Sequence, residues 1–206
     1  MALRMKTRWH RSRRSRRNIE GSRQPKSLED LAGVMGFNLW KVAKEVFTHM
    51  ENEGFKFGDD QQVVDILSEL IAFLVQVIDR MLYQQVDEED REKFIIALAK
   101  HLAKTMESNQ FDIHGEGDYI TPFITIMNAR FTEYAECGYN EDGPGYEFKR
   151  CLASHISDVM RATDNKWVVE HVMEIEVPKA VKSIQRLVRE ILAIGKASAS
   201  QGAKPA

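Results

Sequence analysis

The densest run of potential metal ligands in this sequence lies between residues 112 and 118. Carboxylates and one imidazole alternate there with other residues, as at the opening of a calcium-binding loop. Such a loop needs an acidic ligand at its twelfth position, and that position, counted from Asp112, is Phe123. The calcium pattern fails, but the run stays the first candidate for a metal site, against the alternative of a polar turn between helices capped by Asp118. The candidate ligands are Asp112, His114, Glu116 and Asp118.

Two further sets of histidines and carboxylates have helical spacing. Glu45 and His49 are four residues apart, and His171 has Glu170 beside it and Glu174 three residues later. Residues three or four apart share one face of a helix, so each set could supply two or three ligands. No Glu-x-x-His motif of the helical di-metal proteins occurs, and no second ligand helix is evident. The alternative is an ordinary polar face at the surface of a bundle.

The sequence has two cysteines, Cys137 and Cys151, and no CxxC motif. Cys151 precedes His155 by four residues, so an imidazolium could lie on the same helix face and activate the thiolate. The alternative is a buried structural cysteine. Two cysteines are too few for a disulfide scaffold and are typical of a reducing compartment, which predicts a cytoplasmic protein. No phosphate-binding, dinucleotide-binding or GxSxG motif is present, and no cofactor is expected.

The N-terminal tail is rich in arginine. Residues 1–26 hold ten of the 29 Lys and Arg and one of the 31 acidic residues, so the tail carries a charge of +9 and the remainder −11. Guanidinium groups in such a segment could bind RNA or DNA phosphates. The alternatives are a solvated tail, a segment translated upstream of Met35, and a transit peptide. The candidate nucleic-acid-binding residues are Arg8, Arg11, Arg13, Arg14, Arg16 and Arg17.

The apolar periodicity predicts that six helices position these side chains. A short helical start capped by Ser27 is expected to be interrupted by Gly33 and Gly36. The expected fold is an all-α, single-domain bundle at 35–195, with a disordered basic tail at 1–34 that the core does not need and a flexible tail at 196–206. A loop is expected from Ser108 to Asp118 and a kink at Pro178. The expected helices are 37–53, 59–85, one that begins after Val86, 119–137, 146–162 and 164–194.

The last expected helix carries an apolar stripe with 4-3-4-3 spacing, while lysines and arginines occupy its other faces. The stripe could pack on its own bundle or form an interface with a second copy or a partner. No run approaches the ~20 apolar residues of a membrane span; the longest is Leu70–Val75. The candidate interface residues are Val181, Ile184, Val188 and Ile191.

These observations predict a non-catalytic helical interaction protein that binds another protein or assembles with itself. Two alternatives come from other functional classes. One is a metal- or thiol-dependent enzyme, and the other is a binder of RNA or DNA through the arginine tail.

Overall fold

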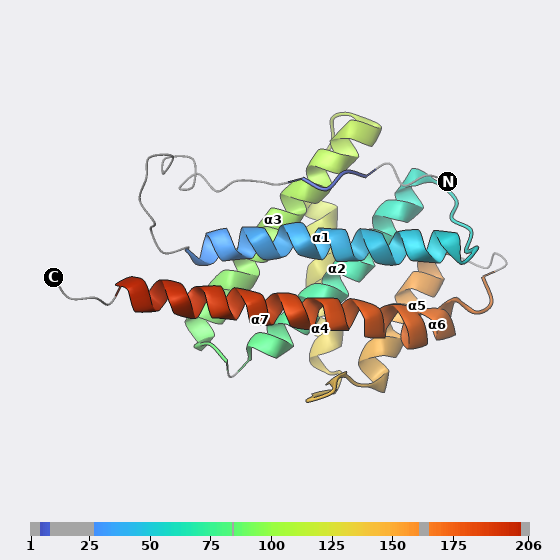
Figure 1. Ribbon diagram of the computed structural model, residues 1–206. Coiled ribbons are helices and arrows are strands. Elements are labelled where there is room, and N and C mark those ends of the chain that lie inside the picture. The colour runs from blue at the N-terminus through green and yellow to red at the C-terminus, as the bar shows by residue number, and fades with distance from the viewer. Residues whose placement is uncertain (1–4, 9–26, 84, 161–164, 203–206) are drawn as a thin grey trace.

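The computed structural model describes residues 5–8, 27–83, 85–160 and 165–202 (Figure 1). The expected all-α bundle is confirmed, because helices make up nearly all of the regular structure. The last three helical segments follow one another directly, with a π-helix (η1) between two α-helices. The elements are α1 (Leu28–Asn52), α2 (Asp60–Leu82), α3 (Glu88–His114), α4 (Ile120–Ala135), β1 (Tyr139–Asn140), β2 (Gly143–Pro144), α5 (Tyr146–Met160), α6 (Val168–His171), η1 (Val172–Glu176) and α7 (Val177–Gly202).

Helix α2 is the centre of the bundle and contacts α1, α3, α4, α5 and α7. Figure 1 shows α1 and α7 side by side in opposite directions, lying across the other helices. Within the described ranges, α2 alone is long and apolar enough to cross a membrane, although its longest apolar run is only Leu70–Val75. In the structure 83% of that apolar window is buried, as in the core helix of a soluble protein.

Helix α1 begins seven residues before Met35, which corrects the predicted boundary between tail and bundle. Ser27 and Asp30 form a capping box at its start, and Leu31 is buried. The helix then continues through Gly33 and Gly36, where the sequence predicted an interruption. Residues 28–34 therefore belong to the bundle and not to the tail, and removal of residues 1–34 would delete part of a core helix.

Contact with α3 explains Gly36 but not Gly33. A Cβ atom at Gly36 would lie 2.6 Å from Cδ2 of His101, whereas one at Gly33 would lie 3.7 Å from Nδ1 of the same ring. The His101 ring is buried and so has little room to move. Gly36 thus permits the close approach of α1 and α3, while Gly33 has room for a methyl group.

The two positions should respond to alanine in opposite ways. Gly36→Ala should destabilise the protein by about 1–2 kcal/mol, because overpacking costs more than the helix propensity of alanine returns. Gly33→Ala is the matched control and should be neutral or stabilising by up to ~1 kcal/mol. Urea unfolding of both variants checks this, and equal effects would show that His101 does not limit the helix spacing.

Three other boundaries differ from the sequence prediction. Helix α3 continues to His114 through the segment expected to be a loop, and Gly115, with φ of 85°, ends it. Helix α7 continues to Gly202 instead of ending near residue 194. The expected turn at 138–145 includes a two-residue antiparallel pair, Tyr139–Asn140 with Gly143–Pro144.

A π-helix lies directly before the position where the sequence predicts a kink, Pro178. In an α-helix the proline ring would clash with the carbonyl group of Glu174, four residues earlier, and proline has no N–H to donate. Glu174 lies in η1, whose wider i→i+5 turns end directly before Val177. The widened turn therefore accommodates Pro178 without a break between α6 and α7.

The apolar stripe of α7 faces the interior of the bundle. Its residues lie where α7 contacts α1 and α2, so one protomer buries them without a second copy. The buried residues are Val181, Ile184, Val188 and Ile191.

Candidate functional sites

The structure does not bring the four predicted metal ligands at 112–118 together as one group. Asp112 and His114 lie in the last turn of α3 and Glu116 is exposed in the following turn. Asp118 accepts a hydrogen bond from the Thr121 amide at 3.0 Å, which lowers the pKa of Asp118. In the described part of the chain, two other groups of His, Cys and carboxylate side chains bring their ligand atoms within 4.8 Å of one another, and none of these four residues belongs to either group.

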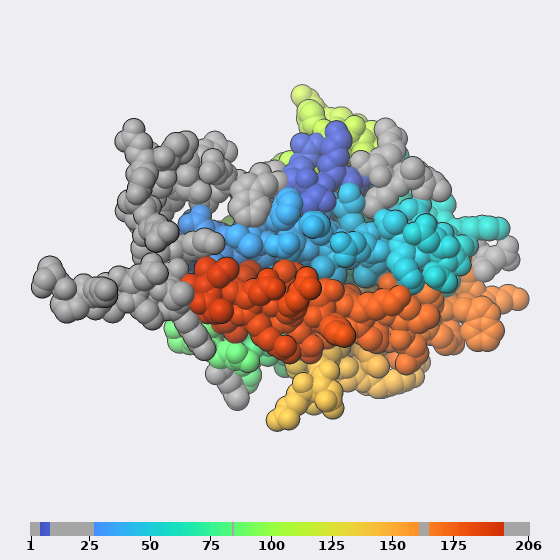
Figure 2. All heavy atoms as spheres, in the orientation of Figure 1, coloured from blue at the N-terminus to red at the C-terminus, as the bar shows by residue number. Residues whose placement is uncertain are grey.

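Residues 5–8 contact both α1 and α3, and the surface that they cover, which includes Lys44, Asn109 and Asp112, is named the groove. Figure 2 shows this dark-blue segment beside α1 and against the end of α3. The Asn109 side chain contacts both backbone polar groups of Lys6. Its Oδ1 accepts from the Lys6 amide at 2.5 Å, and its Nδ2 donates to the Lys6 carbonyl at 3.0 Å. Because Nδ2 also donates to the Thr105 carbonyl at 2.8 Å, the amide of Asn109 is fixed in orientation.

Apolar and charged contacts flank this pair of hydrogen bonds. Met5 is 3% exposed, and its carbonyl accepts from Nζ of Lys44 at 2.6 Å. Asp112 pairs with Lys6 at 3.1 Å and also with Arg8. The hydrogen bond from Lys6 and the charge of Arg8 hold the pKa of Asp112 below its usual value. These contacts hold a segment of the same chain in which an apolar residue is followed by two basic ones, at positions 6 and 8.

Arg8 is the single candidate nucleic-acid-binding residue that falls in the described part of the chain, and its guanidinium contacts Asp112. The remaining candidates lie outside the described residues. They are Arg11, Arg13, Arg14, Arg16 and Arg17.

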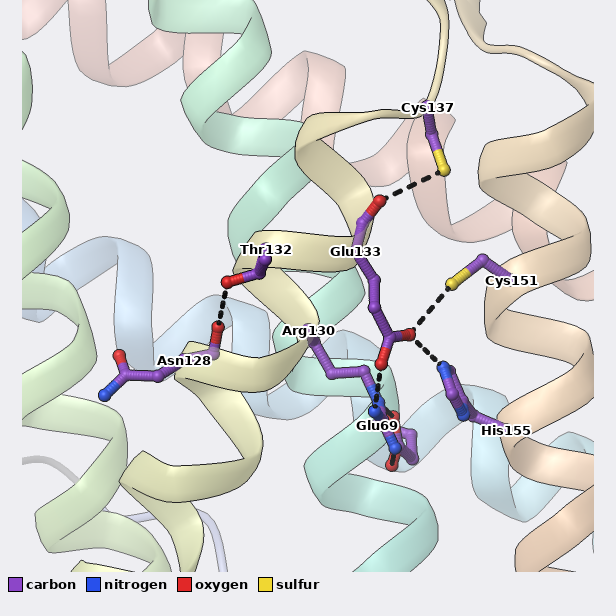
Figure 3. A network of polar contacts seen from close by, with 8 residues as sticks. All are labelled: Glu69, Asn128, Arg130, Thr132, Glu133, Cys137, Cys151 and His155. Atoms are coloured by element: carbon purple, nitrogen blue, oxygen red, sulfur yellow. Dashed lines mark hydrogen bonds and ion pairs between the residues drawn. The ribbon is translucent and has the colours of Figure 1, made fainter.

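A second cluster joins α4 to α5. Cys151 and His155 share one face of α5, and both contact Oε2 of Glu133, at 3.6 Å and 2.5 Å (Figure 3). Arg130 fixes the other carboxylate oxygen of Glu133 at 2.8 Å and binds the buried carboxylate of Glu69 through two hydrogen bonds of 2.6 and 2.7 Å. The cluster is thus a connected network across α2, α4 and α5.

The electrostatics of this cluster oppose thiolate formation. Burial and the neighbouring carboxylate of Glu133 raise the pKa of Cys151 to about 12. The carboxylate of Glu133 contacts both the thiol of Cys151 and the imidazole of His155, so the imidazole has Glu133 as its hydrogen-bond partner. These contacts and the raised pKa do not favour the predicted activation of Cys151 by His155, and they lead us to expect a weakly nucleophilic thiol at neutral pH. Cys137 is also a free thiol, with a pKa raised mainly by burial.

The third cluster brings together two histidines that the sequence analysis treated separately. His49, near the end of α1, and His171, at the end of α6, both face Oε1 of Glu176, at 2.5 Å from Nδ1 and 2.7 Å from Nε2. The carboxylates predicted to accompany them, Glu45 in one set and Glu170 and Glu174 in the other, are outside this group. Glu176 was missed, because the spacing rules for α-helices do not connect it to His171.

The comparisons with models of protein families, with curated protein sequences and with solved structures give no match to this chain.

Proposed function

We propose that this protein is a non-catalytic interaction protein that binds an extended, basic segment of a partner protein in the groove between α1 and α3. One observation carries the proposal: the buried amide of Asn109 contacts both backbone polar groups of Lys6. A side chain that pairs with a backbone N–H and C=O recognises any extended residue, whichever chain supplies it.

The flanking contacts supply the specificity of the proposed groove. The buried site of Met5 selects an apolar side chain, and Asp112 selects basic side chains one and three positions later. The body of the protein, with its net charge of −11 over residues 27–206, favours the approach of a basic segment. The proposed ligand is thus a peptide with the pattern apolar, basic, any residue, basic.

The chain's own segment 5–8 would compete with such a partner. A tethered segment has an effective concentration on the order of millimolar, so a partner must bind the groove more tightly or be present at high local concentration. In this account the N-terminal segment keeps the groove filled until a partner displaces it. Two free thiols suit a reducing compartment, and we place this role in the cytoplasm.

The proposal predicts that the groove binds the segment in trans. A labelled peptide of residues 1–12 should bind a chain that lacks residues 2–8, measured by fluorescence anisotropy. Asn109→Ala should weaken binding about tenfold, because two hydrogen bonds to the peptide backbone are lost. Asn128→Ala is the matched control, since Asn128 is exposed on α4 and should leave the affinity unchanged.

A second variant tests the groove without replacing the buried Asn109, whose loss could alter the fold itself. Asp112→Asn changes a solvent-exposed side chain and should weaken binding of this peptide while sparing a peptide in which Lys6 and Arg8 are replaced by glutamine. Peptide binding that neither variant alters would refute the proposed groove. Nucleic-acid binding by the other tail arginines stays a separate prediction, because those residues lie outside the described ranges.

A further inference from the structure

The π-helix creates a constellation that an α-helix could not form. Residues five apart in an α-helix point about 140° away from each other around the helix axis. In a π-helix the i→i+5 hydrogen bond makes them neighbours one turn apart. The five-residue η1 segment therefore places Glu176 beneath His171, five residues earlier, and the two side chains contact at 2.7 Å.

Helix α1 supplies the third member of this constellation. The His49 ring stacks near the His171 ring, with centroids 5.9 Å apart and an interplanar angle of 19°. One ring nitrogen of His49, one of His171 and one oxygen of Glu176 all lie within 4.8 Å of one another. The side chain of Glu176 is only 3% exposed, and the two imidazoles are the partners of its Oε1. A buried carboxylate that faces two imidazole nitrogens has the composition of a three-ligand transition-metal site.

We infer that His49, His171 and Glu176 form a binding site for a divalent transition-metal ion of the Zn²⁺ class. Imidazole and carboxylate ligands suit this class, and the ion would neutralise the buried carboxylate. Tetrahedral zinc with bonds of about 2.0–2.2 Å separates its ligand atoms by about 3.3 Å. The Glu176 oxygen, now at 2.5 and 2.7 Å from the two nitrogens, would move apart from them by less than about 1 Å. His49 is about one-third exposed, so the ion and a water ligand have access.

The surroundings of His49 indicate how this binding would be tuned. A metal bound at Nδ1 requires the ring proton on Nε2. Nε2 lies 3.6 Å from the Glu53 carboxylate, which would accept the Nε2 proton and so favour this tautomer. It also lies 3.3 Å from the Lys179 ammonium, a donor that would oppose a proton on Nε2. Glu53 therefore supports metal binding in this arrangement, and Lys179 weakens it.

The test measures Zn²⁺ binding to the full chain by titration calorimetry. Cys151→Ser serves as the background, because the other ligand cluster contains that thiol. One zinc ion should bind per chain, and His49→Ala or His171→Ala should weaken binding at least tenfold. His114→Ala is the matched control and should leave the affinity unchanged, since His114 lies outside the group.

Two exposed positions give a finer test that does not alter the ligands. Lys179→Met should tighten zinc binding severalfold, and Glu53→Gln should weaken it by a similar factor. Circular dichroism of each variant checks that the fold is retained. Absence of detectable zinc binding at concentrations up to about 100 micromolar would overturn the inference. Binding that is as tight in His49→Ala and His171→Ala as in the parent chain would also overturn it, and would place the ion elsewhere.

Discussion

Replacement of Ile184 by Asp is expected to unfold the bundle. Ile184 is 0% exposed and lies on the face of α7 that packs on α1 and α2. A carboxylate there has no partner and costs several kcal/mol, which is comparable with the 5–15 kcal/mol that stabilises a typical domain. Far-ultraviolet circular dichroism and a urea titration should show loss of helicity or a large fall in the free energy of unfolding.

The control for this variant lies two residues away on the same helix. Lys182 is exposed, so Lys182→Asp should change stability by less than about 1 kcal/mol. An Ile184→Asp chain that stays helical but changes from dimer to monomer in light scattering would contradict the intramolecular packing. That result would place the α7 stripe between two chains.

The reactivity of Cys151 should be about 50-fold lower than that of an unperturbed thiol near neutral pH. A pKa of about 12, against the ordinary thiol value of 9.0, reduces the thiolate fraction about a thousandfold. The greater nucleophilicity of the more basic thiolate returns part of that loss. Because the pKa is raised, the rate should climb about tenfold per pH unit and level off only near pH 12. The measurement is the rate at which the Cys137→Ser chain reacts with a disulfide reagent, because Cys151 is then its one cysteine.

Glu133→Gln tests the cause of the low reactivity. Removal of the neighbouring negative charge should lower the pKa of Cys151 and speed the reaction severalfold near neutral pH. Glu136→Gln is the matched control, since Glu136 is exposed and is not among the main causes of the shift. Fast reaction of Cys151 at pH 7 in the Cys137→Ser chain would contradict the raised pKa of this thiol.

The helical period located most of the bundle, because apolar contacts in this fold follow the 3.6-residue repeat closely. It predicted the stripe of α7 and the shared face of Cys151 and His155. It failed where a helix depends on contacts with a distant segment. Gly36 lies within α1, where the lack of a side chain leaves room for the His101 ring of α3. Residues 108–114 stay helical, and Asn109 among them binds Lys6, which lies 103 positions earlier.

The candidate sites were harder to predict than the helices. His49 and His171 were both identified, but their meeting depends on the packing of α1 against the end of the chain. Glu176 depends on a π-helix, which no spacing rule for α-helices reveals; Pro178 was the one local signal of an irregular turn. Glu133 joins Cys151 and His155 from another helix, so the sequence could show the pair and not the carboxylate that controls it.

The proposed groove is tested most directly by the affinity of the peptide of residues 1–12 for two chains, one complete and one without residues 2–8. If segment 5–8 fills the groove, the complete chain should bind the peptide at least severalfold more weakly, because the tethered segment competes at high effective concentration. Asn109→Ala should remove most of this difference between the two chains. Equal, tight binding of the peptide by both chains would mean that the segment does not occupy the peptide's site, and no binding by either chain would contradict the groove as a recognition surface.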